Sequence, residues 1–200
     1  MNPRPQHLRE IEHSIWAELE RAVAPRDVAS AAYDPDGDPA EENAPHEWRV
    51  AVLATVAEGL PDARHIVVRE IDARERCLVF YTDARSPKVR QIEATPQGTL
   101  MFWSQVLGWQ LRMQVRLAVQ TSGLAVSSRW ARLQASAGRR DYLAARAPGS
   151  PLEAPQADLG SRSHFAMIEA QVESIDWLEL HPQGHRRARF GGDGPRWLQP

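Results

Sequence analysis

The chain has 200 residues, enough to close one substantial hydrophobic core, and we expect a single domain over residues 1–200. Its formal net charge of -2 excludes the strong basic field that attracts nucleic acid or an anionic membrane surface. The only cysteine, Cys77, excludes an internal disulfide, no apolar run approaches the length of a membrane span, and the polar start has no signal-peptide core, so we expect a cytoplasmic protein.

The first 25 residues predict an amphipathic helix that lies across the core and ends near Pro25. Its apolar residues recur at helical spacing with glutamates between them: Leu8, Ile11, Ile15, Leu19 and Val23. Residues 34–46 are rich in Pro, Asp and Glu and poor in apolar residues. We therefore expect an exposed acidic loop there.

From Trp48 onward the pattern changes to the alternation of strands. Apolar runs separated by turn residues predict strands at 50–56, 64–71, 77–82, 99–103 and 109–121, and the short connections favour antiparallel pairing. A short helix is predicted from Ser86 to Glu93, with Ser86 as its N-cap and Pro87 at its first position.

The second half predicts helices at 127–136 and 139–147, followed by strands at 165–172, 175–180 and 186–190. The glycine-rich stretch at 191–194 predicts a turn before Trp197. Six or more antiparallel strands with a few helices indicate a mainly β fold. We expect a small barrel whose helices cover its openings.

Cationic and hydroxyl side chains gather between residues 64 and 88. Arg64 and Arg69 bracket one predicted strand, and the next strand runs into Thr82, Ser86 and Lys88. Guanidinium groups bind phosphate oxygens in pairs, a lysine adds a point charge, and hydroxyls and the free N–H groups of a helix start fill the other acceptor positions. The pattern therefore predicts a phosphate site among Arg64, Arg69, Ser86 and Lys88.

Short motifs in this region resemble the pyridoxamine 5'-phosphate oxidase-like flavoproteins of the FMN-binding split-barrel fold. The resemblance covers roughly residues 48–200. The motifs are Arg64-His65-Ile66-Val67-Val68-Arg69, similar to the family's Arg-x-Val-Leu-Leu-Lys; Phe80-Tyr81-Thr82-Asp83, similar to Phe-Tyr-Thr-Asn; Ser86-Pro87-Lys88, in the place of its Ser-Arg-Lys phosphate clamp; Phe102-Trp103 followed by Gln110; and Arg189-Phe190.

The resemblance implies an antiparallel split β-barrel and a homodimer with FMN at the interface. It also implies the residues that hold FMN: Arg64, His65, Ile66, Val67, Val68, Arg69, Tyr81, Thr82, Ser86, Lys88, Gln110 and Arg189. Where the family has an Arg-x-His triplet that grips the substrate, this chain has His185-Arg186-Arg187, which makes His185 and Arg187 candidate contacts of an anionic substrate. No catalytic residue is identified.

The sequence departs from the oxidase pattern at several positions. Pro87 replaces an arginine of the phosphate clamp, and Leu178 stands where an aromatic flavin contact is expected. We expect an FMN-dependent oxidoreductase whose substrate and electron acceptor are open, including whether it oxidises pyridoxamine or pyridoxine 5'-phosphate. The alternatives are an FMN-binding sensor or carrier without turnover, and a split-barrel reductase that uses another flavin-like cofactor such as a deazaflavin.

Several of these residues also have ordinary structural explanations. The cations could be solvated strand ends, Gln110 an exposed strand residue, and Arg189 a member of a surface ion pair. The tryptophans suit a barrel core or a dimer interface without any ligand. The histidines have no metal-ligand spacing and no Cys/His cluster is present, so we predict no metal site.

Overall fold

The structure is a computed structural model that describes residues 4–24, 46–135, 137–154, 160 and 163–200. The expected acidic loop at 34–46 lies outside the described residues except for His46. The helices are α1 (Leu8–Val23), α3 (Pro87–Ala94) and α4 (Leu124–Gln134), with two 3-10 helices, η1 (Glu47–Arg49) and η2 (Ala137–Tyr142). The strands are β1 (Val50–Ala57), β2 (Leu60–Asp72), β3 (Cys77–Asp83), β4 (Gln97–Ser104), β5 (Trp109–Gln120), β6 (Phe165–Glu179), β7 (Arg186–Gly191) and β8 (Arg196–Leu198).

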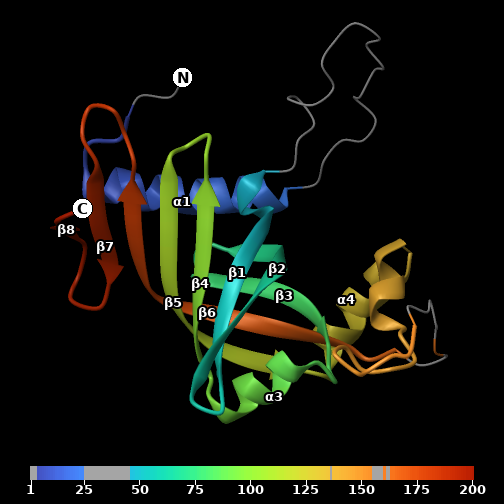
Figure 1. Cartoon of the computed structure of the whole chain (residues 1–200). Helices are drawn as coiled ribbons and strands as arrows, with labels where there is room; N and C mark the ends of the chain where they lie inside the picture. Colours follow the sequence, from blue (N-terminus) through green and yellow to red (C-terminus); the bar gives the residue numbers. More distant parts are fainter. Residues whose placement is uncertain (1–3, 25–45, 136, 155–159, 161–162) are drawn as a thin grey trace, which may run out of the picture.

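The described strands form one antiparallel sheet in the order β3-β2-β1-β4-β5-β6-β7-β8, and β3 also pairs with β6. This extra pairing closes strands β1 to β6 into a barrel (Figure 1). The first half of β6 pairs with β3 and its second half with β7, so β7 and β8 extend from the barrel as a wing. The predicted mainly β fold with flanking helices is confirmed.

Alternation along the strands fills the barrel. In β5, Leu111, Met113 and Val115 are buried, whereas Arg112 and Gln114 between them face outward. The barrel core continues into α1, whose Ile11, Ile15 and Leu19 are fully buried. Burial of such side chains stabilises the fold by about 1.5 to 3 kcal/mol each.

The helices take three different positions around the barrel (Figure 1). Helix α1 lies across one end, α3 lies at the opposite end with Val89 and Ile92 buried, and α4 lies to the side. Helix α4 packs on a small separate cluster that includes Val126, Tyr142 and Phe165. The end of the barrel at α3 is where the predicted phosphate site is located.

Three predicted elements differ from the structure. The strands expected at 165–172 and 175–180 are one strand, β6, because Glu173 is an extra residue in a bulge: Val115 pairs with Val172 and the neighbouring Gln114 pairs with Ser174. The helix expected at 139–147 is only the 3-10 helix η2, which ends at Tyr142. The helix expected at 127–136 begins earlier, at Leu124, after Gly123 with φ 96.

Candidate functional site

The phosphate site predicted from the sequence lies where β2 and β3 separate. These strands pair from Val68 and Phe80 toward their β2–β3 turn, and the register does not continue to Ile66 and Thr82. Along its other edge, β3 pairs with β6 over its whole length. The chain then turns into α3, so a strand edge, a strand end and a helix start meet at one point.

Three side chains meet there through hydroxyl groups. The Lys88 Nζ atom donates a hydrogen bond to Thr82 Oγ1 at 3.2 Å, and Thr82 Oγ1 lies 3.2 Å from Ser86 Oγ. Thr82 and Ser86 are buried, and Ser86 is the N-cap of α3 although its side chain makes no capping hydrogen bond. With Arg64, which approaches from β2, we call these four residues the phosphate corner.

Lys88 is a half-buried cation that forms no ion pair with a carboxylate of the described residues. Burial lowers its pKa, and the nearby charge of Arg64 lowers it further, while Asp83 and Asp62 act in the opposite sense. A cation in this environment gains most from an anion that brings its own negative charge. The donor set suits a phosphate group, because it combines an ammonium, two hydroxyls and an uncapped helix start.

Arg64 is held by four oxygen atoms of the protein. Its Nη1 atom lies 3.2 Å from the carbonyl oxygen of Leu53 and 2.6 Å from Thr55 Oγ1. Its Nη2 atom lies 2.9 Å from Gln91 Oε1 and 2.6 Å from Asp62 Oδ2. The guanidinium group is thus fixed at the corner by two residues of β1, one residue of β2 and one residue of α3.

Arg69 lies apart from the phosphate corner. It is five residues beyond Arg64 on β2, about 16 Å along an extended strand. Its guanidinium carbon lies 5.7 Å from the ring centre of Tyr81, and its side chain hydrogen-bonds Tyr142. The structure therefore brings Arg64, Ser86 and Lys88 together but places Arg69 in a second environment.

This second environment is a cavity of about 280 Å³, which we call the tyrosine pocket and which is lined by Arg69, Glu70, Tyr81, Arg129, Arg132 and Leu133. The Tyr81 hydroxyl donates a hydrogen bond to Glu70 at 2.8 Å, and Arg129 grips the same carboxylate with Nε and Nη2 at 2.9 and 2.6 Å. Burial and the hydrogen bond to Glu70 raise the pKa of Tyr81 to about 12, so its hydroxyl stays protonated at neutral pH. Arg129 thereby fastens α4 to β2.

The residues between Arg64 and Arg69 divide between the two faces of β2. Val68 is buried in the barrel and Ile66 packs against the core. His65 and Val67 are exposed on the outer face, opposite Val52 and Val50 of β1. Only backbone groups of this stretch can face the gap between β2 and β3.

The other predicted site residues lie outside the phosphate corner. Gln110 is on the outer face of β5, between Trp103 and Leu178 of the neighbouring strands. His185 accepts a hydrogen bond from the backbone N–H of His181, and Arg187 binds both carboxylate oxygens of Asp176, at 3.0 and 2.8 Å. Arg187 lies on β7 of the wing, and His185 immediately precedes this strand.

Arg189 of β7 lines a surface cavity of about 360 Å³ that also includes Gln114, Ser174 and Arg196. Its Nη2 atom lies 3.5 Å from Ser174 Oγ. Figure 1 shows β7 and α3 on different parts of the molecule. Within one chain, the structure does not bring Gln110, Arg187 or Arg189 to the phosphate corner.

Sequence reasoning missed the residues that position Arg64. Asp62 precedes it by two residues and so shares its face of β2, and Gln91 follows Lys88 by three residues and so shares its side of α3. These spacings were visible in the sequence, but the contact between the strand and the helix was not. Within the described part of the chain there is no cluster of three or more His, Cys, Asp or Glu that could hold a metal ion, and no helix long and apolar enough to cross a membrane.

Comparison with known proteins matches residues 38–121 to the family described as pyridoxamine 5'-phosphate oxidase, FMN-binding domain. The chain is 30% identical to a pyridoxine/pyridoxamine 5'-phosphate oxidase of Granulibacter bethesdensis over 186 residues, which cover 82% of this chain and 84% of that protein.

Two solved structures share the fold. One is a pyridoxamine 5'-phosphate oxidase-related, FMN-binding protein from Nostoc punctiforme, with a TM-score of 0.63 and 24% identity over 76% of this chain and 88% of that one. The other is PhzG from Burkholderia lata in complex with tetrahydrophenazine-1-carboxylic acid, with a TM-score of 0.64 and 18% identity over 76% and 82%. With its split-barrel topology and the similarity over most of its length, this chain belongs to the pyridoxamine 5'-phosphate oxidase FMN-binding domain family.

Proposed function

We propose that this chain binds FMN with the cofactor phosphate in the phosphate corner, and that it is an FMN-dependent oxidoreductase related to the pyridoxine/pyridoxamine 5'-phosphate oxidases. The observation that carries the proposal is Lys88, a half-buried cation without a carboxylate partner among the described residues, beside two buried hydroxyls and a helix start. This donor set lies where β2 and β3 separate, which leaves a strand edge for an elongated ligand.

Lys88, Ser86 and Thr82 of the phosphate corner each have a defined task in this proposal. Lys88 supplies the charge that binds the phosphate, and Ser86 and Thr82 supply hydroxyl donors that are already held in place by burial. Backbone groups of residues 66–68 and of Tyr81 and Thr82 line the rest of the cofactor. Bound FMN supplies a ring that accepts two electrons from a substrate, and the protein contributes placement and polarity.

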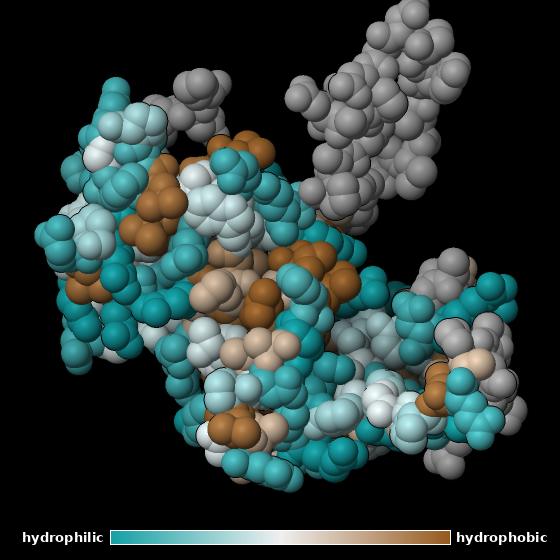
Figure 2. Space-filling view, in the orientation of Figure 1, coloured by the Kyte–Doolittle hydropathy of each residue, from teal (hydrophilic) through white to brown (hydrophobic). Residues whose placement is uncertain are grey.

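We further propose that the chain is a homodimer with FMN at the interface. The outer face of β1, β2 and β4 carries half-exposed apolar side chains: Val50, Val67, Met101 and Trp103. Figure 2 shows apolar residues gathered in the middle of this side of the molecule. A second copy packed there would bury them and could bring Gln110 and Arg189 of one subunit toward the corner of the other.

The proposed substrate is a small anionic molecule. The tyrosine pocket contains three arginines and one carboxylate, Glu70, and Arg69 forms no ion pair with a carboxylate of the described residues. An anionic group bound near Arg69 would balance this excess of positive charge. His185 and Arg187 are proposed as further contacts, with Arg187 oriented by Asp176.

A second candidate function is FMN binding without turnover. Arg187 is engaged by Asp176 through both carboxylate oxygens, which leaves it less available for a substrate. Anaerobic addition of pyridoxine or pyridoxamine 5'-phosphate separates the two candidates. An oxidase loses the yellow flavin absorbance on reduction, whereas a passive binder keeps it.

The location of the phosphate is tested by titration of the apoprotein with FMN and with riboflavin, which lacks the phosphate. Replacement of Lys88 by alanine removes a charge-assisted contact of about 1.5 to 3 kcal/mol and should weaken FMN binding by roughly tenfold to a hundredfold, with riboflavin unchanged. The matched control is Arg90→Ala, an exposed cation on the same helix, which should change FMN binding less than twofold. Equal losses for FMN and riboflavin, or no loss, would refute this placement.

A further inference from the structure

Arg64 differs from Lys88 in how fully its donors are used. Its two terminal nitrogens carry four N–H groups and lie within 3.2 Å of four protein oxygens, those of Leu53, Thr55, Gln91 and Asp62. Lys88, with three N–H groups, has one hydroxyl partner, Thr82. A phosphate can therefore accept hydrogen bonds from Lys88 without displacing any group. It can bind the terminal nitrogens of Arg64 only by displacing a protein acceptor.

Asp62 is the acceptor most comparable to a phosphate. Its Oδ2 atom lies 2.6 Å from Arg64 Nη2, and its side chain is 46% exposed, so the carboxylate can move away into solvent. The carbonyl of Leu53, by contrast, is part of β1 and cannot leave without breaking the strand. Of the four acceptors, Asp62 is the one that carries a full negative charge.

Gln91 holds Asp62 in this competing position. Its Nε2 atom donates to Asp62 Oδ2 at 2.8 Å while its Oε1 atom accepts from Arg64. The hydrogen bond from Gln91, together with the charges of Arg64 and Lys88, lowers the pKa of Asp62, so the carboxylate is ionised at neutral pH. Asp62 therefore also repels any phosphate that approaches Lys88.

We propose that Asp62 is an internal competitor that occupies Arg64 in the unliganded site and sets the affinity of the corner for phosphorylated ligands. This inference rests on the proposed function, because it requires the cofactor phosphate to bind at Arg64 and Lys88. Binding then includes an exchange in which the phosphate replaces the carboxylate at Nη2, and Asp62 turns toward solvent. The residue weakens the grip on the phosphate without contacting the flavin ring.

The test compares the apoprotein with Asp62→Asn and Asp62→Ala by titration with FMN and with riboflavin, followed by quenching of flavin fluorescence. Removal of the carboxylate should tighten FMN binding by roughly three- to fivefold, the size expected for loss of a half-exposed ion pair from the unliganded state. Riboflavin binding should not change. Glu93→Gln, which removes the same charge from an exposed site on α3, should leave both affinities unchanged.

The outcomes separate this inference from the function on which it rests. A raised ratio of FMN to riboflavin affinity in both Asp62 variants, with none in Glu93→Gln, supports competition. An unchanged or lowered ratio, in a protein whose wild type prefers FMN, overturns the inference and makes Asp62 a residue that positions Arg64 for the phosphate. A wild type that binds riboflavin as tightly as FMN overturns the phosphate corner itself.

Discussion

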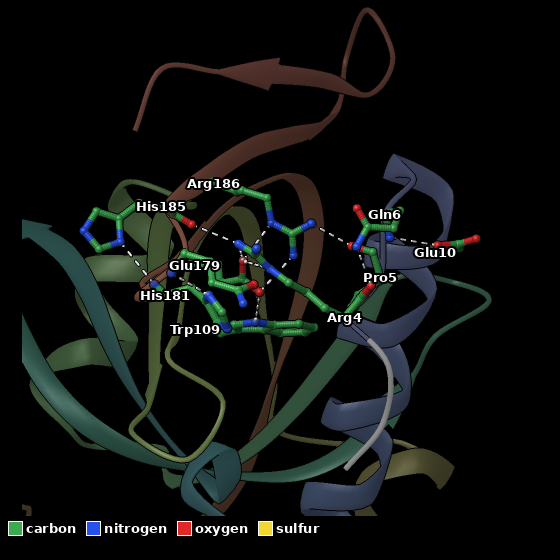
Figure 3. A network of polar contacts seen from close by, with 11 residues as sticks. Arg4, Pro5, Gln6, Glu10, Trp109, Glu179, His181, His185 and Arg186 are labelled. Carbon is green, nitrogen blue, oxygen red and sulfur yellow. Dashed lines mark hydrogen bonds and ion pairs between the residues drawn. The ribbon is translucent and has the colours of Figure 1, made fainter.

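The carboxylate of Glu179 links the segment before α1 to the wing, and its replacement is the strongest test of the fold. Glu179 ends β6 and is 4% exposed. Figure 3 shows Arg4 and Arg186 converging on it, with Arg186 Nε and Nη2 at 2.7 and 2.9 Å and Arg4 Nε at 2.9 Å. Arg186 also donates to the carbonyl oxygen of Pro5 at 2.7 Å, so replacement of Glu179 by glutamine should loosen the segment that precedes α1.

The cost of this replacement follows from the pKa of the carboxyl group. Burial raises that pKa, but the hydrogen bonds and charges of Arg186 and Arg4 outweigh burial and lower it from 4.5 to about 2. Each pKa unit corresponds to 1.36 kcal/mol, so the ionised carboxylate stabilises the folded state by about 3 kcal/mol relative to the protonated one. Because the folded pKa is the lower one, this stabilisation is present above pH 4.5 and is lost as the pH falls toward 2.

The assay is urea unfolding of the wild type and Glu179→Gln at pH 7 and at pH 2.5. We expect the free energy of unfolding of the variant to be about 3 kcal/mol lower than that of the wild type at pH 7. At pH 2.5 the wild-type carboxyl group binds a proton when the chain unfolds, so we expect most of this difference to vanish. Glu173→Gln on the same strand removes a half-exposed partner of Arg116 and should cost less than about 0.5 kcal/mol. A penalty for Glu179→Gln that is equal at both pH values would refute the electrostatic account.

Two other predictions concern the phosphate corner and the wing. Burial and the charge of Arg64 lower the pKa of Lys88, so FMN affinity should be full while the ammonium is charged and should fall as the pH rises through values below 10.5. In Lys88→Arg the affinity should depend less on pH in this alkaline range. A wild-type affinity that stays constant from pH 7 to 10 would contradict the prediction. Gly191 has φ +104 and a Cβ there would lie 2.4 Å from the carbonyl oxygen of Glu173, so Gly191→Ala should destabilise the protein by about 2 kcal/mol or more. Gly192→Ala, where no atom lies within 4 Å of an added Cβ, should cost about 1 kcal/mol, and thermal unfolding of both variants and the wild type measures the two costs.

The sequence predicted those elements whose apolar pattern is set by one buried face. Helix α1 occupies the expected residues because Ile11, Ile15 and Leu19 follow the helical period and all three are fully buried. Strand β6 was read as two strands because Glu173 and Ser174 interrupt its apolar run. The bulge that accommodates them depends on Gly191 of β7, which is a distant residue that no local pattern reveals.

The expected helix at 139–147 failed for a similar reason. Arg85, which is held by Asp83, donates hydrogen bonds to the carbonyl oxygens of Ala144, Ala145 and Arg146, at 2.7, 3.1 and 3.2 Å. In a helix over 139–147 the carbonyl oxygens of Tyr142 and Leu143 would accept hydrogen bonds from residues 146 and 147. Here they accept from the backbone N–H groups of His164 and Gly160 instead, at 3.1 and 2.6 Å, and this competition outweighs the helix propensity of the segment. The same limit applies to the site. The sequence predicts Arg64 and Lys88 as phosphate contacts, but it does not reveal that Asp62 and Gln91 bind the side chain of Arg64.

The phosphate corner and the tyrosine pocket, which each include one arginine of β2, differ in how their positive charge is balanced. This difference favours the cofactor phosphate in the first region and a second anion in the other. At the phosphate corner, Asp62 opposes Arg64 and Lys88, which leaves one net positive charge. In the tyrosine pocket, Glu70 opposes three arginines, which leaves two. A phosphate bound between Arg64 and Lys88 does not also neutralise Arg69, which lies about 16 Å from Arg64 along the extended strand. The excess charge near Arg69 would then persist in the cofactor-bound protein, where it can favour a second anion, and a substrate without an acidic group would leave it unbalanced.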